Sequence, residues 1–419
     1  MKLLRALSRV VIGLTFLLSG FVKIIDPVGV GLIFEEYFKA AGLGDLHTFA
    51  LLSGVILSAT EMLLGICILV GIRMKYSASA ALFFISFFTV LTLILALFNP
   101  VKDCGCFGEA IKLTNWETFY KNIGLLLFAV LLFLQREKYI PVAPPAWEWS
   151  FAVIFAAGIL FLSVYSYRHL PMIDFMEFKP GTNISERLNY TNSSETPLFE
   201  TVLIYSKNGK KYEFPIENLP DSTYTFVDSK TIQRGGGTAV TDFAIADSEG
   251  EYVTDSILSI KGAQFFVSVP YPDRLNEKGV QRINQFKERL NERSIPVNLL
   301  SGSGSDSVSY HTDLRTLLTL NRSNGGVLYL YDGTIISKWS NRDIPETNLD
   351  KILNEDPELL SAKKRIKEQL SAELAALFLL IIIAIMRMTC RLLYIYKPIE
   401  CESSKEGASI ASDSVIHEI

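Results

Sequence analysis

The chain has 419 residues, of which 49% are hydrophobic and 20% charged, and its formal net charge is −4. This balance supplies no global basic field, so nucleic acid is excluded as an expected partner. The composition changes along the chain: residues 1–168 are dominated by Leu, Phe, Ile, Val and Ala, whereas residues 170–370 carry frequent charges and no cysteine. This change and the length together predict at least two domains.

Six stretches are apolar and long enough to cross a bilayer core of about 30 Å, which takes roughly 20 helical residues. They lie at about 7–25, 48–71, 77–98, 118–135, 149–166 and 373–395. A signal peptide is the alternative for the first stretch, because Lys2, Arg5 and Arg9 precede it. Arg387 and Arg391 shorten the last stretch, whose alternative is a helix buried in the soluble part or lying on the membrane surface. The pattern predicts a multi-pass membrane protein in contact with lipid.

Lysine and arginine residues at the span ends orient the predicted bundle, because positive residues resist translocation. They agree on one topology: Lys2, Arg5, Arg9, Arg73, Lys75, Arg136, Lys138, Arg387, Arg391 and Lys397 all lie inside. Both termini then face the cytoplasm. The loops 26–47 and 99–117 and the domain 170–370 lie outside, which in a double-membrane bacterium is the periplasm. The predicted location is therefore the inner membrane.

The outer loop after the third span contains two cysteines one residue apart, in the sequence DCGCFG from Asp103 to Gly108. A disulfide between Cys104 and Cys106 closes a small, strained ring, which is easily reduced and exchanged. Gly105 relaxes the backbone for that ring. An ionised Asp103 disfavours the neighbouring thiolate and so favours the disulfide. The pair therefore has the properties of a catalytic or shuttling disulfide.

Two alternatives for this pair stay open. The first is a structural disulfide that shapes the loop, and the second is half of a metal site. Metal is disfavoured, because only His47 lies in another outer loop of the bundle and no second cysteine pair completes four ligands.

Ionisable residues within a bilayer are expensive and tend to face a partner or a cavity. Glu61 lies near the middle of the second span, and Lys23, at the outer end of the first, is a candidate partner. The alternative is a neutral Glu61 that is hydrogen-bonded between helices. In a further alternative, Lys23 and Asp26 pair with each other at the membrane interface.

Residues 1–138 resemble the MauE and DoxX-like membrane proteins, in which four helices precede or surround a small outer-loop site. The resemblance rests on SGFVKIIDP (residues 19–27), on Glu61 with Leu64 and Gly65, and on DCGCFG followed by Trp116 and Lys121. Because MauE-type proteins are implicated in maturing a disulfide-rich methylamine dehydrogenase subunit, the resemblance implies thiol redox assistance to a periplasmic client protein. Only the two cysteines carry over as redox residues. The supporting candidates are Lys23, Asp26, Glu61, Asp103, Trp116 and Lys121.

The fold also resembles the four-helix bundles of membrane thiol oxidases that pass electrons to quinone. This chain lacks a second outer cysteine pair to relay electrons. Quinone is therefore disfavoured as a cofactor, and no other cofactor is expected.

Residues 263–371 follow an order typical of a thioredoxin-like α/β domain. We expect a strand at 263–270, a helix at 277–293, a strand at 295–300, a helix at 311–320, a hairpin of 326–331 with 334–339, and a helix at 346–354. Asp332 and Gly333 suit the hairpin turn. The place of the usual CxxC reads Tyr271, Pro272, Asp273, Arg274, so this domain is predicted to bind a client and not to exchange disulfides.

Residues 170–262 are predicted to be mainly β, with alternating runs at 199–205, 222–228 and 252–259. The glycines at 235–237 lack a following GK[ST], which excludes a phosphate loop. The expected division is a four-helix domain at 1–138, a fifth transmembrane helix at 139–169, the β segment, the thioredoxin-like domain, a sixth transmembrane helix at 372–397 and a cytoplasmic tail at 398–419.

Three functions follow from these features. The first is periplasm-facing thiol redox or disulfide maturation through the CxC loop. The second is a non-enzymatic scaffold in which the CxC disulfide only shapes the loop. The third is a small-molecule transporter built around Glu61 and Lys23.

Overall fold

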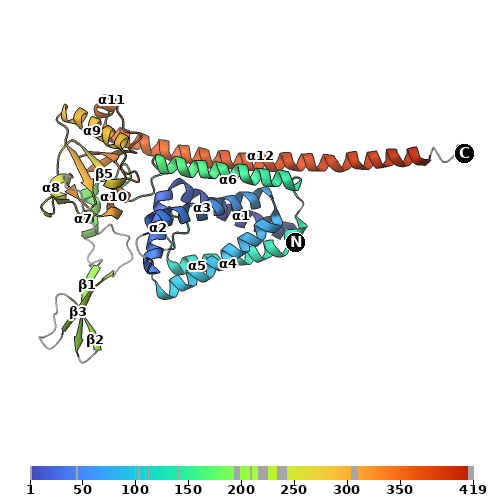
Figure 1. Cartoon of the computed structure of the whole chain (residues 1–419), viewed down its shortest axis with the longest axis horizontal. Helices are drawn as coiled ribbons and strands as arrows, with labels where there is room; N and C mark the ends of the chain where they lie inside the picture. Colours follow the sequence, from blue (N-terminus) through green and yellow to red (C-terminus); the bar gives the residue numbers. More distant parts are fainter. Residues whose placement is uncertain are drawn as a thin grey trace. The chain divides into compact units, whose positions relative to one another are not determined.

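The computed structural model describes residues 2–43, 46–99, 101, 104–108, 110–111, 113–139, 141–192, 199–207, 210–215, 225–233, 243–302 and 310–413. The chain divides into two compact units (Figure 1). One comprises Met1–Met176 with Lys363–Ile419, and the other comprises Glu177–Ala362. Each is described by itself.

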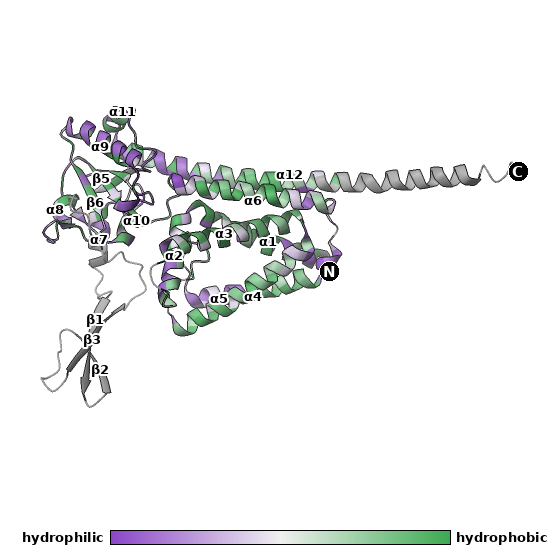
Figure 2. Cartoon of the chain, viewed as in Figure 1, coloured by the Kyte–Doolittle hydropathy of each residue, from purple (hydrophilic) through white to green (hydrophobic). Residues whose placement is uncertain are grey.

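The first unit is a helical bundle. Its elements are α1 (Lys2–Ile25), α2 (Pro27–Ala40), α3 (His47–Val70), α4 (Met74–Phe98), α5 (Asn115–Leu134), the 3-10 turn η1 (Arg136–Lys138), α6 (Pro145–Arg168) and most of α12 (Pro357–Asp413). Six of these helices are long and apolar enough to cross a membrane, and each overlaps one of the six predicted spans. Figure 2 shows hydrophobic residues along these helices. The chain is thus a multi-pass membrane protein.

Helices α1 and α3 pack closely, and this contact positions the site described below. A Cβ at Gly20 would lie 2.4 Å from the backbone nitrogen of Met62, so only glycine permits the approach. The core around the contact includes Leu17, Met62 and Ile66, and α12 adds Ile383 to the same cluster. The last span therefore contacts the bundle core through one face.

The segment 26–47, expected as a loop, instead contains helix α2. The Asp26 side chain accepts a hydrogen bond from the Gly29 backbone nitrogen at 3.0 Å, and Pro27 occupies the first helical turn. Both are favourable starts for a helix. With 14 residues, α2 is too short to span the bilayer. It lies beside α3, where the rings of Phe38 and Phe49 stack with centroids 5.6 Å apart.

Two arginines bind the last carbonyls of α3. Arg9 donates to the backbone oxygens of Ile68 at 2.7 Å and Leu69 at 2.8 Å, and Arg387 donates to Leu69 at 2.9 Å. Such contacts satisfy carbonyls that a helix C-terminus leaves without partners. Helix α12 continues without a break to Asp413. Much of the predicted tail from residue 398 is therefore helical.

The second unit contains a six-stranded sheet of order β4-β7-β6-β5-β8-β9. The strands are β4 (Ala246–Asp247), β5 (Ala263–Val269), β6 (Val297–Ser301), β7 (Tyr310–His311), β8 (Gly326–Tyr331) and β9 (Thr334–Trp339). Strands β5, β6 and β7 run parallel, and β8 is antiparallel to both β5 and β9. The helices are α7 (Ile184–Asn192), α8 (Thr254–Leu258), α9 (Glu277–Asn291), α10 (Leu314–Leu320) and α11 (Leu349–Asn354), with a 3-10 turn η2 (Pro272–Arg274). The order of elements predicted for residues 263–354 is present.

Alternate residues of β5 pack into two hydrophobic cores, one on each face of the sheet, because successive side chains of a strand point to opposite faces. Phe265 packs with Phe286 of α9, whereas Phe266 packs with Phe178 and Ile245. Residues 177–192 and 243–262 thus share a core with the sheet. The folded unit begins at Glu177, earlier than the expected boundary at 263.

Within the run at 252–259, expected as a strand, residues 254–258 instead form helix α8, and Tyr252 pairs with Ala246 in an isolated β-bridge. Val253 and Ile257 are four residues apart and share one helix face, so their spacing suits a helix as well as a strand. Ile257 and Leu258 are both buried in the core. The runs at 199–205 and 222–228 do form strands, in a separate three-stranded sheet of β1 (Phe199–Lys207), β2 (Lys210–Pro215) and β3 (Thr225–Gln233). The glycines at 235–237 lie outside the described residues.

Candidate functional site

The loop with the two cysteines connects α4 and α5, and polar contacts fix both of its ends. Thr114 and Glu117 form a capping box that starts α5. The Asn115 side-chain nitrogen donates to Asn99 Oδ1 at 2.9 Å and to the Val101 carbonyl at 3.0 Å. Asp103, a predicted supporting residue, lies outside the described residues.

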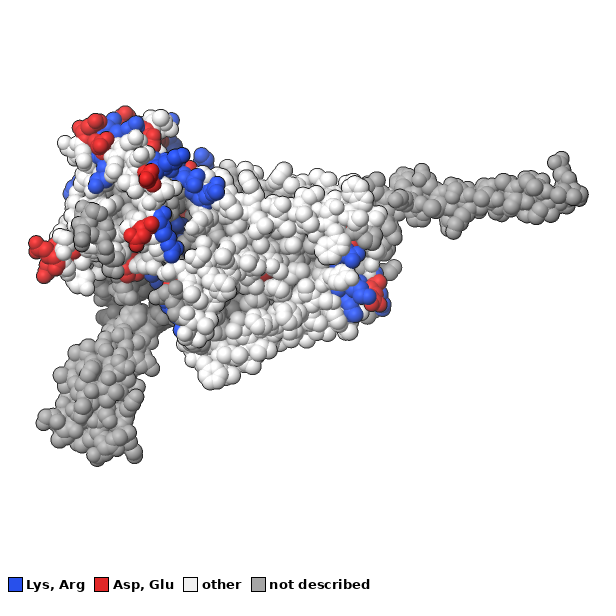
Figure 3. Space-filling model, viewed as in Figure 1, with Lys and Arg blue, Asp and Glu red and all other residues white. Residues whose placement is uncertain are grey.

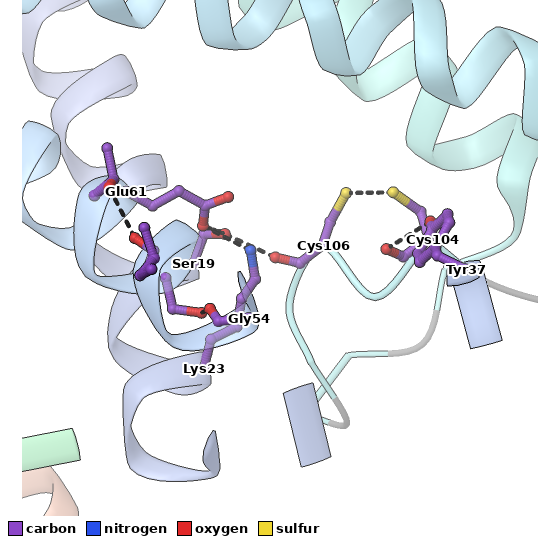
Figure 4. A network of polar contacts seen from close by, with 10 residues as sticks. Ser19, Lys23, Tyr37, Gly54, Glu61, Cys104 and Cys106 are labelled. Carbon is purple, nitrogen blue, oxygen red and sulfur yellow. Dashed lines mark hydrogen bonds and ion pairs between the residues drawn. The ribbon is translucent and has the colours of Figure 1, made fainter. Parts of the chain in front are cut away.

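Cys104 and Cys106 face each other as free thiols. Their sulfur atoms lie 3.1 Å apart, a hydrogen-bond contact (Figure 4). The structure thus describes the reduced pair, and the Cys104–Cys106 disulfide stays a prediction for the oxidised form. Cys104 is buried and Cys106 half-buried.

Both the backbone conformation and the packing at position 105, between the two cysteines, require glycine. Its φ is +63°, in the left-handed region that favours glycine. An added Cβ would lie 2.7 Å from the Cδ1 atom of Ile33 on α2. Glycine therefore lets the loop turn while α2 packs against it.

Side chains from two helices hold the carbonyls of the pair (Figure 4). The Tyr37 hydroxyl on α2 donates to the Cys104 carbonyl at 3.2 Å, and the Ser19 hydroxyl on α1 lies 2.7 Å from the Cys106 carbonyl. Ser19 also lies 2.9 Å from Glu61 Oε2. Its single proton can be donated to only one of these two acceptors at a time.

The expected contact between Lys23 and Glu61 is present. Lys23 Nζ lies 2.6 Å from Glu61 Oε2, and the two side chains are only 6% and 8% exposed. Asp26, the other expected neighbour of Lys23, caps α2. Through Ser19, the buried pair is joined to the backbone of Cys106.

The surroundings give the two thiols different pKa values. A hydrogen bond from Cys104, assisted by the positive charges of Lys121 and Lys23, lowers the pKa of Cys106 to about 6. The same hydrogen bond, with burial, raises the pKa of Cys104. Lys121 Nζ lies 4.6 Å from the centroid of the Phe107 ring, beside the pair. Cys106 is therefore the more acidic thiol of the pair and the one that carries the negative charge near neutral pH.

This difference predicts an unusual pH dependence of alkylation. Below about pH 6, Cys106 is a protonated thiol, and above it the reactive thiolate, so its rate with iodoacetamide should rise near pH 6 and level off by neutrality. A thiol at the ordinary value of 9.0 gains reactivity only at higher pH. Mass spectrometry of alkylated peptides from the reduced protein measures the profile. A midpoint near 9 would contradict the assignment of Cys106 as the thiolate.

The cysteine pair lies at the wall of a cavity of about 690 Å³ inside the first unit. Its lining is mainly aromatic and aliphatic and comes from α1 to α5 and the loop. The lining includes Phe16, Lys23, Phe34, Thr60, Phe88 and Asn122. Apolar walls with a few polar groups are typical of sites for small hydrophobic molecules.

The remaining expectations have separate outcomes. Lys121 lines the cavity, whereas Trp116 is half exposed and stacks on Tyr120 with ring centroids 6.0 Å apart, so Trp116 does not join the site. Across the described residues, no three His, Cys, Asp or Glu side chains are grouped as metal ligands would be.

Sequence reasoning missed the roles of Ser19 and Tyr37. Ser19 is part of the SGFVKIIDP motif, but its contact with the Cys106 carbonyl depends on the fold. Tyr37 lies in the segment expected as a loop. A signal was present there: Asp26 before Pro27 is a helix start, and Val30, Phe34, Tyr37 and Phe38 have helical spacing.

Comparisons with known proteins identify two segments. Residues 1–135 match the family described as methylamine utilisation protein MauE, and residues 199–234 match a domain of unknown function (DUF8463). No curated protein and no solved structure matches the chain. The first match spans α1 to α5 and the cysteine loop, so the N-terminal bundle is MauE-like, as its motifs indicated.

Proposed function

We propose that this protein is a membrane thiol–disulfide exchange protein that oxidises thiols of client proteins through Cys104 and Cys106. The observation that carries the proposal is the asymmetric thiol pair, in which the pKa of Cys106 is lowered to about 6 beside a buried Cys104. A low thiol pKa next to cationic groups is typical of redox-active cysteines.

Starting from the Cys104–Cys106 disulfide, the exchange takes two steps. A client thiolate attacks the sulfur of Cys106, which forms a mixed disulfide and releases Cys104 to take up a proton. The second client thiol, as its thiolate, then attacks the client sulfur of the mixed disulfide and releases Cys106. The low pKa of Cys106 favours this second step, because a more acidic thiol leaves faster. The client gains one disulfide, and the pair ends as two thiols.

The second unit is proposed to be thioredoxin-like and to hold the client. The strand order β6-β5-β8-β9, with β5 and β6 parallel and the β8–β9 hairpin antiparallel, supports this fold. The place of the usual CxxC is taken by Tyr271 and the turn Pro272–Arg274. Because residues 170–370 contain no cysteine, a role in binding fits better than one in exchange.

The proposed orientation puts the cysteine loop in the periplasm and both termini in the cytoplasm of an inner-membrane protein. Arg5, Arg9, Arg73 and Arg387 support it, because they cluster around the C-terminal ends of α3 and α5, at the end of the bundle opposite the loop. Figure 3 shows Lys and Arg gathered at the end near the N-terminus. Positive residues favour the cytoplasmic side.

Thiol trapping in intact cells tests this function. Acid quenching is followed by alkylation, first with a membrane-impermeant reagent and then with a permeant one. We expect Cys104 and Cys106 to react from outside when reduced and to shift between dithiol and disulfide when the envelope meets reductant or oxidant. Cys67, which is buried in the bundle core, is the internal control and should not change. A pair that is permanently oxidised and insensitive would favour the scaffold.

A further inference from the structure

A second cavity, of about 400 Å³, lies in the first unit, at the end of the bundle opposite the cysteine loop. It forms where the membrane helices α3 and α5 end and α4 and α6 begin, and η1 contributes to its wall. It shares no lining residue with the larger cavity beside the thiols. The exchange reaction proposed above therefore makes no use of it.

The lining of this second cavity carries an excess of available positive charge. Three cationic side chains line it, from Arg73, Lys75 and Arg136. Two carboxylates line it as well, but both have other partners. Glu148 accepts hydrogen bonds from the Arg73 backbone nitrogen at 3.2 Å and from a second backbone nitrogen at 3.1 Å, and Glu137 lies 3.5 Å from Lys75. Among the described residues, no carboxylate lies within ion-pair distance of either guanidinium.

Aromatic rings position the Arg73 guanidinium. Its Cζ atom lies 4.9 Å from the centroid of the Tyr76 ring and 5.4 Å from that of the Trp149 ring. Within the part of the chain that the structure describes, the side-chain nitrogens of Arg73 have no hydrogen-bond acceptor, and its Nε atom is buried. Buried donors without acceptors are unfavourable, so an anionic oxygen that enters the cavity meets donors for which no protein acceptor competes.

The start of α4 adds to the attraction for an anion. The helix begins at Met74, on the cavity wall, and no side chain caps its first N–H groups. A helix N-terminus favours negative charge, and a planar guanidinium can bind two phosphate oxygens at once. A phosphate group therefore matches this combination of donors.

The surroundings of the cavity indicate what carries the phosphate. Tyr76, Trp147 and Trp149, in the first turns of α4 and α6, are all more than half exposed. Exposed tyrosine and tryptophan at the ends of membrane helices are typical of the level of the lipid headgroups. Leu134, the last residue of α5, is exposed beside them and leaves an apolar surface for acyl chains.

We propose that this second cavity binds a phosphate group and that an anionic lipid of the adjacent leaflet supplies it. The two guanidiniums bind the phosphate oxygens, while the lipid chains lie along the apolar surfaces of the neighbouring helices. In the orientation proposed above, this leaflet is the cytoplasmic one. Binding requires neither that orientation nor the exchange reaction, so this inference and the proposed function can fail separately.

Native mass spectrometry of the full-length protein, delipidated in detergent, tests the proposal with phosphatidylglycerol as the probe. We expect Arg136→Gln to raise the Kd of the first bound phosphatidylglycerol by about tenfold or more, because charge-assisted hydrogen bonds are lost. Lys138→Gln is the matched control, since it removes the same charge from the same turn but at a residue that does not line the cavity. Its Kd should stay within about twofold of that of the unmodified protein, as expected for an exposed charge.

Two further measurements complete the test. Arg73→Gln removes the other guanidinium and is the second variant if Arg136→Gln misfolds. If these variants bound phosphatidylglycerol as tightly as Lys138→Gln does, the site would be refuted. Inorganic phosphate, added at the concentration of the lipid, should not displace it. If inorganic phosphate displaced the lipid, and Arg136→Gln weakened phosphate binding, the phosphate site would stand and the lipid source would be wrong.

Discussion

Replacing Cys106 by serine is expected to abolish oxidation of a dithiol peptide, with a fall in rate on the order of 10³-fold or more, because the disulfide that the peptide thiolate attacks cannot form. Cys104→Ser should act differently, because it keeps the reactive sulfur and removes the one that resolves the intermediate. Incubated with a disulfide-bonded peptide, the variant should accumulate a mixed disulfide, because the Cys106 thiolate attacks one peptide sulfur, the other leaves as a thiol, and no Cys104 thiolate follows. Non-reducing electrophoresis and mass spectrometry of the linked peptides measure both outcomes.

Cys67→Ser is the matched control for these variants. Cys67 is buried among apolar side chains of the bundle and lies in the last turn of α3. Its replacement should leave the rate of peptide oxidation within twofold. If the double variant Cys104→Ser/Cys106→Ser retained full function in cells, the exchange role would be ruled out and the scaffold would explain the protein better.

The membrane spans were predictable because their signal is local. A helix in the bilayer must satisfy its own backbone, so about 20 consecutive apolar residues suffice to identify one. The sheet of the second unit was predictable for a similar reason. Its strands and helices alternate over short distances, and Asp332 with Gly333 marks the β8–β9 turn, with φ of 48° and 76°.

Other elements depended on contacts between distant residues. Strand β4 has two residues, and its place in the sheet depends on pairing with β7, more than 60 residues later. At α8, the spacing of Val253, which precedes the helix, and Ile257 suits either a helix or a strand, and packing in the core decides between them. Local patterns do not contain this information.

The candidate site likewise has features that local sequence indicates and features that depend on the fold. The sequence identified Lys23, Glu61, Cys104 and Cys106 as single residues of interest, because charges within a membrane and paired cysteines are conspicuous. The fold adds the connection among them: Ser19 touches both Glu61 and the Cys106 carbonyl, although these partners are 42 and 87 residues away. The cavity is formed by five helices and the loop, so no single segment could have indicated it.

Breaking the buried ion pair is expected to destabilise the bundle strongly. Lys23→Met leaves the Glu61 carboxylate without its ammonium partner, and Glu61→Gln leaves the Lys23 ammonium without its carboxylate. Removal of one partner of a buried pair costs about 3–5 kcal/mol. The double variant Lys23→Met/Glu61→Gln should be more stable than the two single effects predict, because no uncompensated charge remains. Thermal release of buried Cys67 to a thiol-reactive dye reports unfolding of this unit.

The same two variants also separate a role at the site from a purely structural one. The positive charge of Lys23 lowers the pKa of Cys106, whereas the negative charge of Glu61 raises it. The pH midpoint of Cys106 alkylation should therefore move up in Lys23→Met and down in Glu61→Gln, although both variants are less stable. Lys39→Met, at an exposed lysine paired with Glu35, is the control and should move neither quantity appreciably. Loss of function in Glu61→Gln with an unchanged alkylation profile would instead favour a transporter, because the carboxylate would then matter independently of the thiols.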